Sequence, residues 1–367
     1  MWPAASVLSW QPRGNGTGPR EALHEKTPTV KIWGRLAALA GLAAATWMIA
    51  ESGWREIVAA LFAAGWGVIP VIALHGPQMV ASGLGWRTAL PGERPPSVGL
   101  FLFWRLIREA VNALLPVAQV GGEVVGARLM ALPPPRGGGV PLGAASASVT
   151  VDLTLEMAAQ VPFTLIGLGL LLTGHAAPEL AAWVLRGLGV AVAVLAALIA
   201  AQRFGLLRVL EGRLLRLARR HGWQGMEAIK GLHAATVAVY RSPWRIAVGV
   251  LCHLASWLLG ALEVWAAFWA LGRPVSLEDA LIVESLGQAF HSLGFAVPGA
   301  LGVQEGGLIL VCGLLGIPAP IALELSLLKR VREVVLGLPG LLAWHLRERA
   351  PRQAGAWTRT TKEEPGT

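Results

Sequence analysis

The sequence predicts an all-α, polytopic membrane protein, and three observations lead to this fold class. Hydrophobic residues make up 54% of the chain and charged residues only 14%, whereas about 25% of the residues of a soluble domain are charged. The mean hydropathy is correspondingly high, at +0.56. The apolar residues also form long blocks instead of short alternating segments. Within hydrocarbon every backbone amide must be hydrogen-bonded inside its own segment, so these blocks must be helices.

Six apolar blocks approach or exceed the ~20 residues that a helix needs to cross a bilayer. They cover residues 32–50, 57–75, 140–173, 180–201, 246–271 and 318–346. We therefore expect about six transmembrane helices in one membrane domain, 32–346. The polar, Gly- and Pro-containing residues 1–31 lack the apolar core of a signal peptide. We expect them to form a disordered cytoplasmic tail, and residues 347–367 to form a basic cytoplasmic tail.

The segment 202–245 is the most basic part of the chain, with nine Lys or Arg residues against Glu211 and Glu227. Because Lys and Arg mark the cytoplasmic side of a membrane protein, both termini and this segment are predicted to be cytoplasmic. Four leucines recur in it at helical spacing, at Leu206, Leu210, Leu214 and Leu217. This pattern predicts an amphipathic helix lying on anionic lipid head groups. The net charge of +9 then reflects topology, and no nucleic-acid partner is expected.

Two apolar segments, 101–130 and 281–315, carry charged residues and are interrupted near the middle by proline and glycine. The interrupting residues are Pro116, Gly121 and Gly122 in the first segment and Pro298, Gly299 and Gly302 in the second. Proline removes a backbone donor and glycine unwinds readily, so each segment is expected to form two half-helices. Such breaks occur at membrane depth where they are buried in protein or line a wet cavity. We therefore predict two re-entrant segments.

The two broken segments also resemble each other. A shift of 182 residues places Pro116 on Pro298, Ala118 on Ala300 and Glu123 on Glu305. It also brings 57–75 near 246–271, and 140–173 near 318–346. With six full spans and two re-entrant segments the two halves would have opposite orientation, as in transporters built from inverted repeats.

Many ionisable residues fall within the apolar segments, where each costs about 2.5–3.5 kcal/mol at the bilayer centre unless it is paired. They are Arg108, Glu109, Glu123, Asp152, Glu156, Glu263, Glu284, Glu305, Glu324, Lys329, Arg330, Arg332 and Glu333. Asp152 and Glu156 share one helix face because they are four residues apart. We expect an ion-pair network that connects these carboxylates, and Glu305, with Arg108 or the basic cluster 329–332. The network either surrounds a substrate cavity at the two breaks or only fixes the packing of the helices.

The predicted substrate-binding residues are charged or amide side chains near the two breaks. They are Arg108, Glu109, Asn112, Gln119, Glu123, Arg128, Asp152, Glu156, Gln288, Gln304, Glu305, Lys329, Arg332 and Glu333. Half-helix N-termini and arginines suit an anionic or phosphate-bearing head group. The amides and carboxylates instead suit a neutral polyol head group.

Signatures of enzymes are missing from the sequence. There is no P-loop, no HExxH and no GxSxG motif. Cys252 and Cys312 lie in apolar segments and are expected to pack as small hydrophobic residues. We therefore expect no catalytic residues, no metal and no cofactor.

Three stretches carry a resemblance to a known family. They are REAVNALLPVAQVGGEVVGARLM (108–130), ESLGQAFHSLGFAVPGALGVQEGG (284–307) and ALELSLLKRVREVVLGLPGLLAW (322–344). Together they resemble the flippase-like transmembrane domain of lysylphosphatidylglycerol synthases over residues 32–346. The motifs VPGALGVQEGG and KRVRE are similar to those of its hopanoid-biosynthesis-associated subgroup. The resemblance implies a bacterial inner-membrane protein that moves or handles lipids, with re-entrant helices around a central cavity. The sequence contains no aminoacyl-transfer domain, so we do not expect it to make lysyl-lipid.

The sequence thus leads to the hypothesis of a lipid flippase or transporter that handles hopanoid or a related lipid. The movement of the lipid would be passive or coupled to an ion gradient, because no ATP site is present. Its partners would be the membrane lipid as substrate and anionic head groups at 202–245. One alternative is an intramembrane lipid-modifying enzyme with Asp152, Glu156 or Glu305 as acid–base groups. Another is a scaffold that recruits lipid-biosynthetic enzymes through its basic segment.

Overall fold

The computed structural model describes residues 62, 65–92, 95–115, 121–132, 139–174, 178–220, 231–293 and 302–349. Within these residues the protein is all-helical, with eleven α-helices, α3 to α13, which confirms the predicted all-α class. The chain divides into two compact units, 1–43 and 44–367, and all described residues lie in the second. The described residues do not include the predicted tail 1–31 or the predicted span 32–50. Of the predicted tail 347–367 they include only the first three residues.

In the described part of the chain, four helical stretches are long and apolar enough to cross a membrane. They are Gly65–Thr88, which joins a short 3₁₀ turn (Gly65–Gly67) to α3 (Val68–Thr88), and α6 (Leu142–Gly174), α7 (Pro178–Arg203) and α10 (Pro243–Ala270). The other helices are α4 (Val98–Leu114), α5 (Gly121–Ala131), α8 (Leu206–Arg220), α9 (Leu232–Tyr240), α11 (Leu277–Leu293), α12 (Val303–Leu314) and α13 (Ala319–Arg349). The helices α6, α7 and α10 confirm three of the predicted spans.

The predicted end of the second span, at residue 75, was wrong, because α3 continues to Thr88. Polar and small residues such as Gln78 and Ser82 lower the hydropathy after residue 75. They are nevertheless buried in the bundle, and the Ser256 hydroxyl of α10 donates a hydrogen bond to the Gln78 carbonyl oxygen at 3.0 Å. Packing against α10, and not high hydropathy, therefore stabilises this part of α3.

The last predicted span is present as α13, but its composition differs from that of the other long helices. Its charged residues exclude it from the four apolar stretches. At 1.5 Å per residue it is about 46 Å long, which exceeds the thickness of the hydrocarbon core. Since Leu325, Leu328 and Val331 are buried, its apolar face packs inside the bundle.

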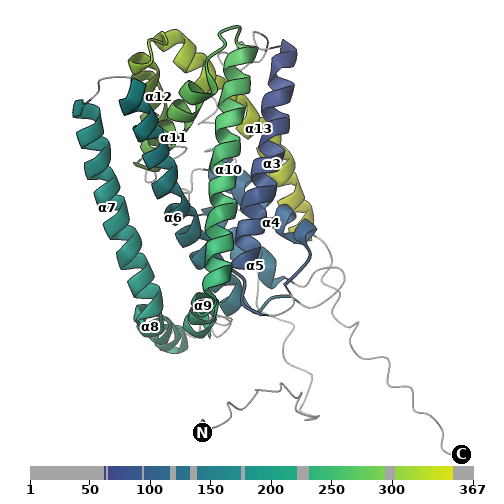
Figure 1. The fold of residues 1–367 in the computed structure, drawn as a ribbon. Helices are drawn as coiled ribbons and strands as arrows, with labels where there is room; N and C mark the ends of the chain where they lie inside the picture. The colour runs from purple at the N-terminus through teal and green to yellow at the C-terminus, as the bar shows by residue number, and fades with distance from the viewer. Residues whose placement is uncertain are drawn as a thin grey trace, which may run out of the picture. The chain divides into compact units, whose positions relative to one another are not determined.

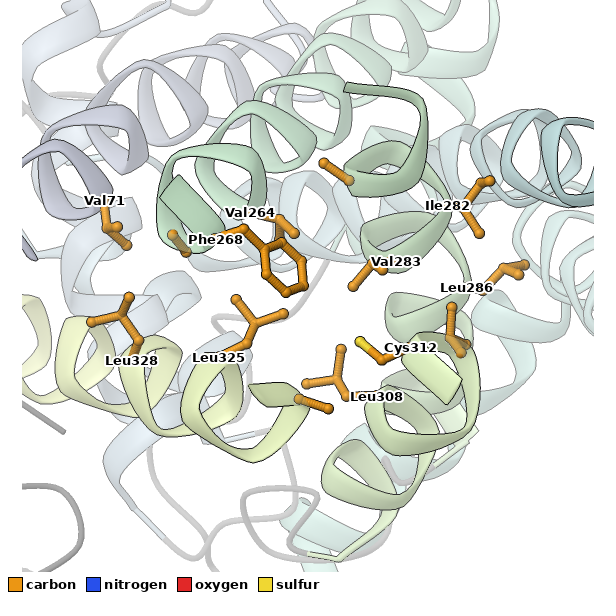
Figure 2. Close-up of a cluster of buried hydrophobic side chains, with 14 of the residues drawn as sticks. Val71, Val264, Phe268, Ile282, Val283, Leu286, Leu308, Cys312, Leu325 and Leu328 are labelled. Atoms are coloured by element: carbon orange, nitrogen blue, oxygen red, sulfur yellow. The ribbon is translucent and has the colours of Figure 1, made fainter. Parts of the chain in front are cut away.

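The buried hydrophobic residues form two clusters at opposite ends of the bundle. One cluster joins the start of α3, the ends of α6 and α10, and α11, α12 and the start of α13 (Figure 2). Val71, Phe268 and Leu325 lie in it. The other joins the end of α3, the start of α6, and α4, α5 and α9, around Trp86 and Met130. The pair α4–α5 and the pair α11–α12 therefore lie at opposite ends of the bundle (Figure 1).

Helix pairs from distant parts of the sequence pack closely. The main pairs are α3 with α10, α4 with α13, and α6 with α11. Glycine permits the approach of α13 to α4, because a Cβ added at Gly340 would lie 2.6 Å from the Cβ of Ala110. At the α6–α11 contact, a Cβ added at Gly167 would overlap the Ser285 hydroxyl. These close contacts hold the charged faces of the helices at fixed distances.

The helices α7 and α8 are more exposed than the rest of the bundle. The helix α7 packs against α6, α8 and α9, and its most apolar window has no buried residue. It lies along one side of the bundle (Figure 1). The helix α8 lies within the basic segment 202–245 and exposes Leu206, Leu210 and Leu217. An apolar surface of this extent is what lipid covers in a membrane protein.

Candidate functional site

A cavity of about 1440 Å³ lies among α3, α4, α6, α7, α10, α11 and α13. Its wall on the α7 side includes Leu188, Val190, Ala191 and Val194. The other helices contribute most of the charged and amide side chains of the lining, and α7 adds Glu179 and Arg186. The cavity is therefore amphipathic.

Arg108 of α4 is the centre of the first charged cluster. It is buried, its Nε lies 2.6 Å from Glu123 Oε2 of α5, and its Nη1 donates to Asp152 of α6. The second oxygen of Asp152 lies 2.9 Å from His253 Nε2 of α10. The guanidinium also lies 5.1 Å from the ring centroid of Trp86 of α3. One arginine thus joins α3, α4, α5 and α6, which requires its charge to be balanced within the site.

Arg105, one turn earlier on α4, extends this cluster toward the cavity. Its Nη2 lies 3.5 Å from Glu156 and its Nη1 lies 3.8 Å from Asp152. Its Nε lies 3.9 Å from Glu109 on the same helix. The predicted common face of Asp152 and Glu156 is therefore confirmed, and both carboxylates meet the same two arginines, Arg105 and Arg108.

A second cluster surrounds α12 and α13. Lys329 Nζ donates to Glu284 Oε2 of α11 at 2.5 Å. Arg330 Nη2 donates to Glu305 Oε1 at 3.3 Å, and its Nη1 donates to Glu333 at 3.3 Å. The other Glu305 oxygen accepts a hydrogen bond from the Gly302 amide at 2.7 Å, so Glu305 also caps α12. Glu305 therefore has both an electrostatic and a capping role.

A third cluster surrounds Glu263 of α10. Arg332 Nη1 donates to its Oε1 and Gln78 Nε2 donates to its Oε2, each at 2.5 Å. His75 Nδ1 lies 3.3 Å from the same Oε2, and His75 Nε2 lies 2.6 Å from Glu109 Oε1. The cluster connects α3, α4, α10 and α13 through polar side chains alone.

Most of the predicted binding residues lie at the cavity. Those that line it are Arg108, Glu109, Asn112, Glu123, Glu156, Gln288, Gln304, Lys329, Arg332 and Glu333. Asp152 lies behind the arginines, and Glu305 contacts the cavity residue Arg330. Arg128 is elsewhere, because it forms an exposed bidentate pair with Glu348 at 2.9 and 3.1 Å. The structure therefore does not bring Arg128 to the cavity.

The predicted break residues are described only in part. Gly121 and Gly122 begin α5, and Gly302 precedes α12 with a φ of +79°. Gly122 permits a close approach to α4, since an added Cβ would overlap the Arg108 carbonyl oxygen. Gln119, Pro116, Pro298 and Gly299 lie outside the described residues.

Several site residues were not predicted as such from the sequence. Examples are His75, Gln78, Arg105, Gln160 and His253, which all line the cavity. A signal for part of this set was present: His75, Gln78 and Ser82 are three and four residues apart and therefore share one helix face. Among the described residues, no group of three or more His, Cys, Asp or Glu side chains is arranged to hold a metal ion.

Comparison with known families gives one match that covers most of the chain. The family described as lysylphosphatidylglycerol synthase TM region matches residues 32–340. Comparisons with curated proteins and with solved structures gave no match. This family is linked to the handling of lipids, and the multi-pass helical fold described above agrees with it. The chain belongs to the lysylphosphatidylglycerol synthase transmembrane-region family.

Proposed function

We propose that the protein is a lipid flippase or transporter of the bacterial inner membrane and not an enzyme. The observation that carries this proposal is the amphipathic cavity of about 1440 Å³. Pockets for small molecules are typically about 300–1,000 Å³, so this cavity has room for a head group together with part of its hydrocarbon tails. The tails would lie along α7, and the head group would lie among the charged side chains of α4, α6, α11 and α13.

The exposure of the charged groups favours a hydroxyl-rich head group over a phosphate. At the first charged cluster, Arg105 and Arg108 have side chains only 13% and 3% exposed. The carboxylates of Glu109 and Glu156 are 34% and 23% exposed. At this cluster, away from the exposed Arg186 of α7, a phosphate would meet the more accessible carboxylates before the cations, whereas hydroxyl groups can donate to the carboxylates. This agrees with a hopanoid or a related polyol lipid, which the motif VPGALGVQEGG suggests by resemblance.

We also propose that the chain contains an inverted repeat with two re-entrant segments. The order α3–α4–α5–α6 recurs as α10–α11–α12–α13. A shift of 182 residues maps the end of α3, Thr88, on the end of α10, Ala270, and the start of α5, Gly121, on the start of α12, Val303. The packing is reciprocal, since α4 packs on α13 and α11 packs on α6. Alternating access by motion of one half against the other is the mechanism that such repeats support.

The lengths of the broken pairs support the re-entrant proposal. The helices α5 and α12 have 11 and 12 residues, well below the ~20 residues needed to span a bilayer. The chain enters and leaves α4–α5 at the end of the bundle that holds Leu90 and Val140. It enters and leaves α11–α12 at the end that holds Val275 and Ala322. On this proposal the basic helix α8 lies on anionic lipid at the cytoplasmic face, together with both termini.

Reconstitution of the purified protein tests the function directly. Vesicles of phosphatidylethanolamine and phosphatidylglycerol would carry a tail-labelled hopanoid polyol or a tail-labelled phosphatidylglycerol, with an impermeant quencher outside. We expect faster access of the hopanoid probe to the quencher with the protein than in empty vesicles. The Glu156→Gln variant should be slower, because Glu156 faces the cavity, and Arg128→Gln should match the wild type.

Other outcomes of the same experiment would contradict the proposal. A new lipid species detected by mass spectrometry would indicate an intramembrane enzyme. A scaffold for lipid-biosynthetic enzymes would be indicated by two results together. The purified protein would move neither probe, and deletion of 206–220 in cells would disrupt lipid production.

A further inference from the structure

His75 stands between two carboxylates from different helices. Its Nε2 lies 2.6 Å from Glu109 Oε1 of α4, and its Nδ1 lies 3.3 Å from Glu263 Oε2 of α10. The side chains of His75 and Glu263 are 8% and 2% exposed, whereas that of Glu109 is 34% exposed and lines the cavity. The group therefore has a buried end and an end that faces the cavity.

The hydrogen-bond geometry of His75, Glu109 and Glu263 determines how many protons these three side chains hold together. An ionised carboxylate only accepts hydrogen bonds, and a neutral imidazole has a single N–H. With a carboxylate oxygen at each ring nitrogen, both contacts are hydrogen bonds only if the group holds one additional proton. Glu263 already accepts from Arg332 and Gln78, which favours its ionised form. The additional proton is therefore shared between His75 and Glu109.

The charged surroundings come from each helix that packs on α3. The helix α4 contributes Arg105 and Glu109, and α10 contributes Glu263 and His253, the latter bonded to Asp152. The helix α13 contributes Arg332 and Glu333, and α6 contributes Asp152 and Glu156. With the additional proton, His75, Glu109, Glu263 and Arg332 have a net charge of zero; without it they carry −1.

The site also lies where the two halves of the chain meet. His75 and Glu109 belong to α3 and α4, whereas Glu263 and Arg332 belong to α10 and α13. Loss of the proton breaks the hydrogen bond between His75 and Glu109, within the first half, and leaves an excess negative charge beside the buried Glu263. This uncompensated charge weakens the contact between the halves.

We propose that His75, with Glu109 and Glu263, is a proton-binding site that couples lipid movement to a proton gradient. This inference rests on the proposed transport function and names its coupling ion. The proton would pass from His75 Nε2 to Glu109 Oε1 and then to water in the cavity. His75 would become neutral and keep its N–H toward Glu263. Imidazole suits this task because its unperturbed charge change falls between about pH 5 and 8.

Transport under a pH gradient is the first test, with His75→Gln as the main variant. Glutamine can still donate a hydrogen bond but cannot take up a proton in this pH range. In the proteoliposomes described above, with the membrane potential clamped by potassium and valinomycin, a gradient of one pH unit should enrich the hopanoid probe in one leaflet. At one proton per lipid the limit is about tenfold. The enrichment should vanish in His75→Gln, whatever the rate at which the probe equilibrates without a gradient in this variant.

His233→Gln is the matched control, since His233 is a buried histidine on α9 and does not line the cavity. It should keep the enrichment. Gradient-dependent enrichment that survives in His75→Gln would overturn the inference, and so would a wild type that moves the probe with no response to the gradient. Either result leaves the proposed transport function in place.

Direct observation of the histidine is the second test, and it needs no transported lipid. Nitrogen-15 NMR of ring-labelled histidine in nanodiscs, with His75→Gln for assignment, should show one histidine that changes from the doubly to the singly protonated form between about pH 5 and 8. Its midpoint should move in Glu109→Gln. A His75 that holds one protonation state throughout this range would refute the proton site, even if no probe is transported. Absence of transport alone would refute only the proposed function.

Discussion

The first half of the described chain, α3–α6, and the second half, α10–α13, use the same order of helices but hold their charged side chains differently. The buried anchors correspond. At a shift of 182 residues, Trp86 matches Phe268 and Met130 matches Cys312, and all four side chains are fully buried. The hydrophobic framework is thus similar in the two halves, and their difference lies in the polar groups.

The charges at the start of α5, in the first half, are enclosed, although Glu109 and Glu156 of the same half are 34% and 23% exposed. Glu123, in the first turn of α5, pairs with Arg108 of the preceding helix at 2.6 Å, and their side chains are 9% and 3% exposed. Arg108 also binds Asp152, which is completely buried. A substrate cannot easily replace one partner of such a buried ion pair, because separating the two charges in a low-dielectric interior is costly.

The charges at the start of α12, in the second half, are more open. Glu305 occupies the position that matches Glu123, but its side chain is 26% exposed and it pairs at 3.3 Å with Arg330 from α13. Glu333, at 17%, shares the same arginine. On the proposed repeat, matching positions therefore have different surroundings, and we expect the carboxylates near α12 to be the ones that a substrate can displace.

The largest effect should follow removal of the enclosed cation, in Arg108→Gln. Asp152 and Glu123 would then be left buried without their main partner, which costs about 3–5 kcal/mol of folding free energy. Thermal unfolding in detergent and the yield of monodisperse protein would measure this loss. The control is Arg128→Gln, which removes an exposed pair worth about 0–1 kcal/mol. Similar stability of the two variants would contradict the view that the first half is held by its buried charges.

The sequence was sufficient for the framework of the protein. Block length predicted α6, α7 and α10, because these helices have faces that lipid can cover and their hydropathy is high throughout. The Pro and Gly breaks predicted the separation of α4 from α5 and of α11 from α12. The capping of α12 by Glu305 is likewise local, since donor and acceptor are three residues apart.

The expected ion pairs of Arg108 with Asp152 and Glu156, and of Glu305 with the cluster 329–332, are confirmed. Other partners of the charged groups could not be predicted, because they depend on the packing of distant helices. Arg105, for example, was not expected as a partner of Asp152 and Glu156. His75 was only the last residue of a predicted apolar block, and its contact with Glu263, which lies 188 residues away, has no signal in the sequence. Arg128 lay near a break in sequence but pairs with Glu348 at the end of α13. The rotation of each helix about its axis determines which of these residues pair. Sequence patterns define this rotation poorly for a helix with polar groups on several faces.

A smaller effect on stability, with a clear effect on transport, is expected for Glu305→Gln. Its charge is partly exposed, so its loss should change the unfolding free energy by at most about 1 kcal/mol. Translocation of the hopanoid probe should fall about tenfold, as for the loss of one hydrogen bond to a charged group. Glu123→Gln should show the reverse, with lower stability and a smaller change in the translocation rate per folded molecule. Thermal stability and translocation measured on the same preparations decide between the two patterns, and parallel losses in both variants would remove the distinction between the halves.

The smallest effect should come from the helix that connects the halves, α8, which belongs to neither. Its apolar side chains Leu206 and Leu210 are exposed, and Arg208 and Arg216 are exposed beside them. On anionic lipid, Arg208→Gln and Arg216→Gln should each weaken the surface contact by about 1 kcal/mol, with little change in translocation. Quenching of a fluorophore at a cysteine introduced at Leu210 measures this contact in nanodiscs with and without phosphatidylglycerol.

The same cysteine should resist an impermeant thiol reagent added to intact cells, whereas one at the exposed Pro274 should react. The opposite labelling would place α8 on the outer face, and loss of translocation in the folded arginine variants would give α8 a part in the transport cycle itself.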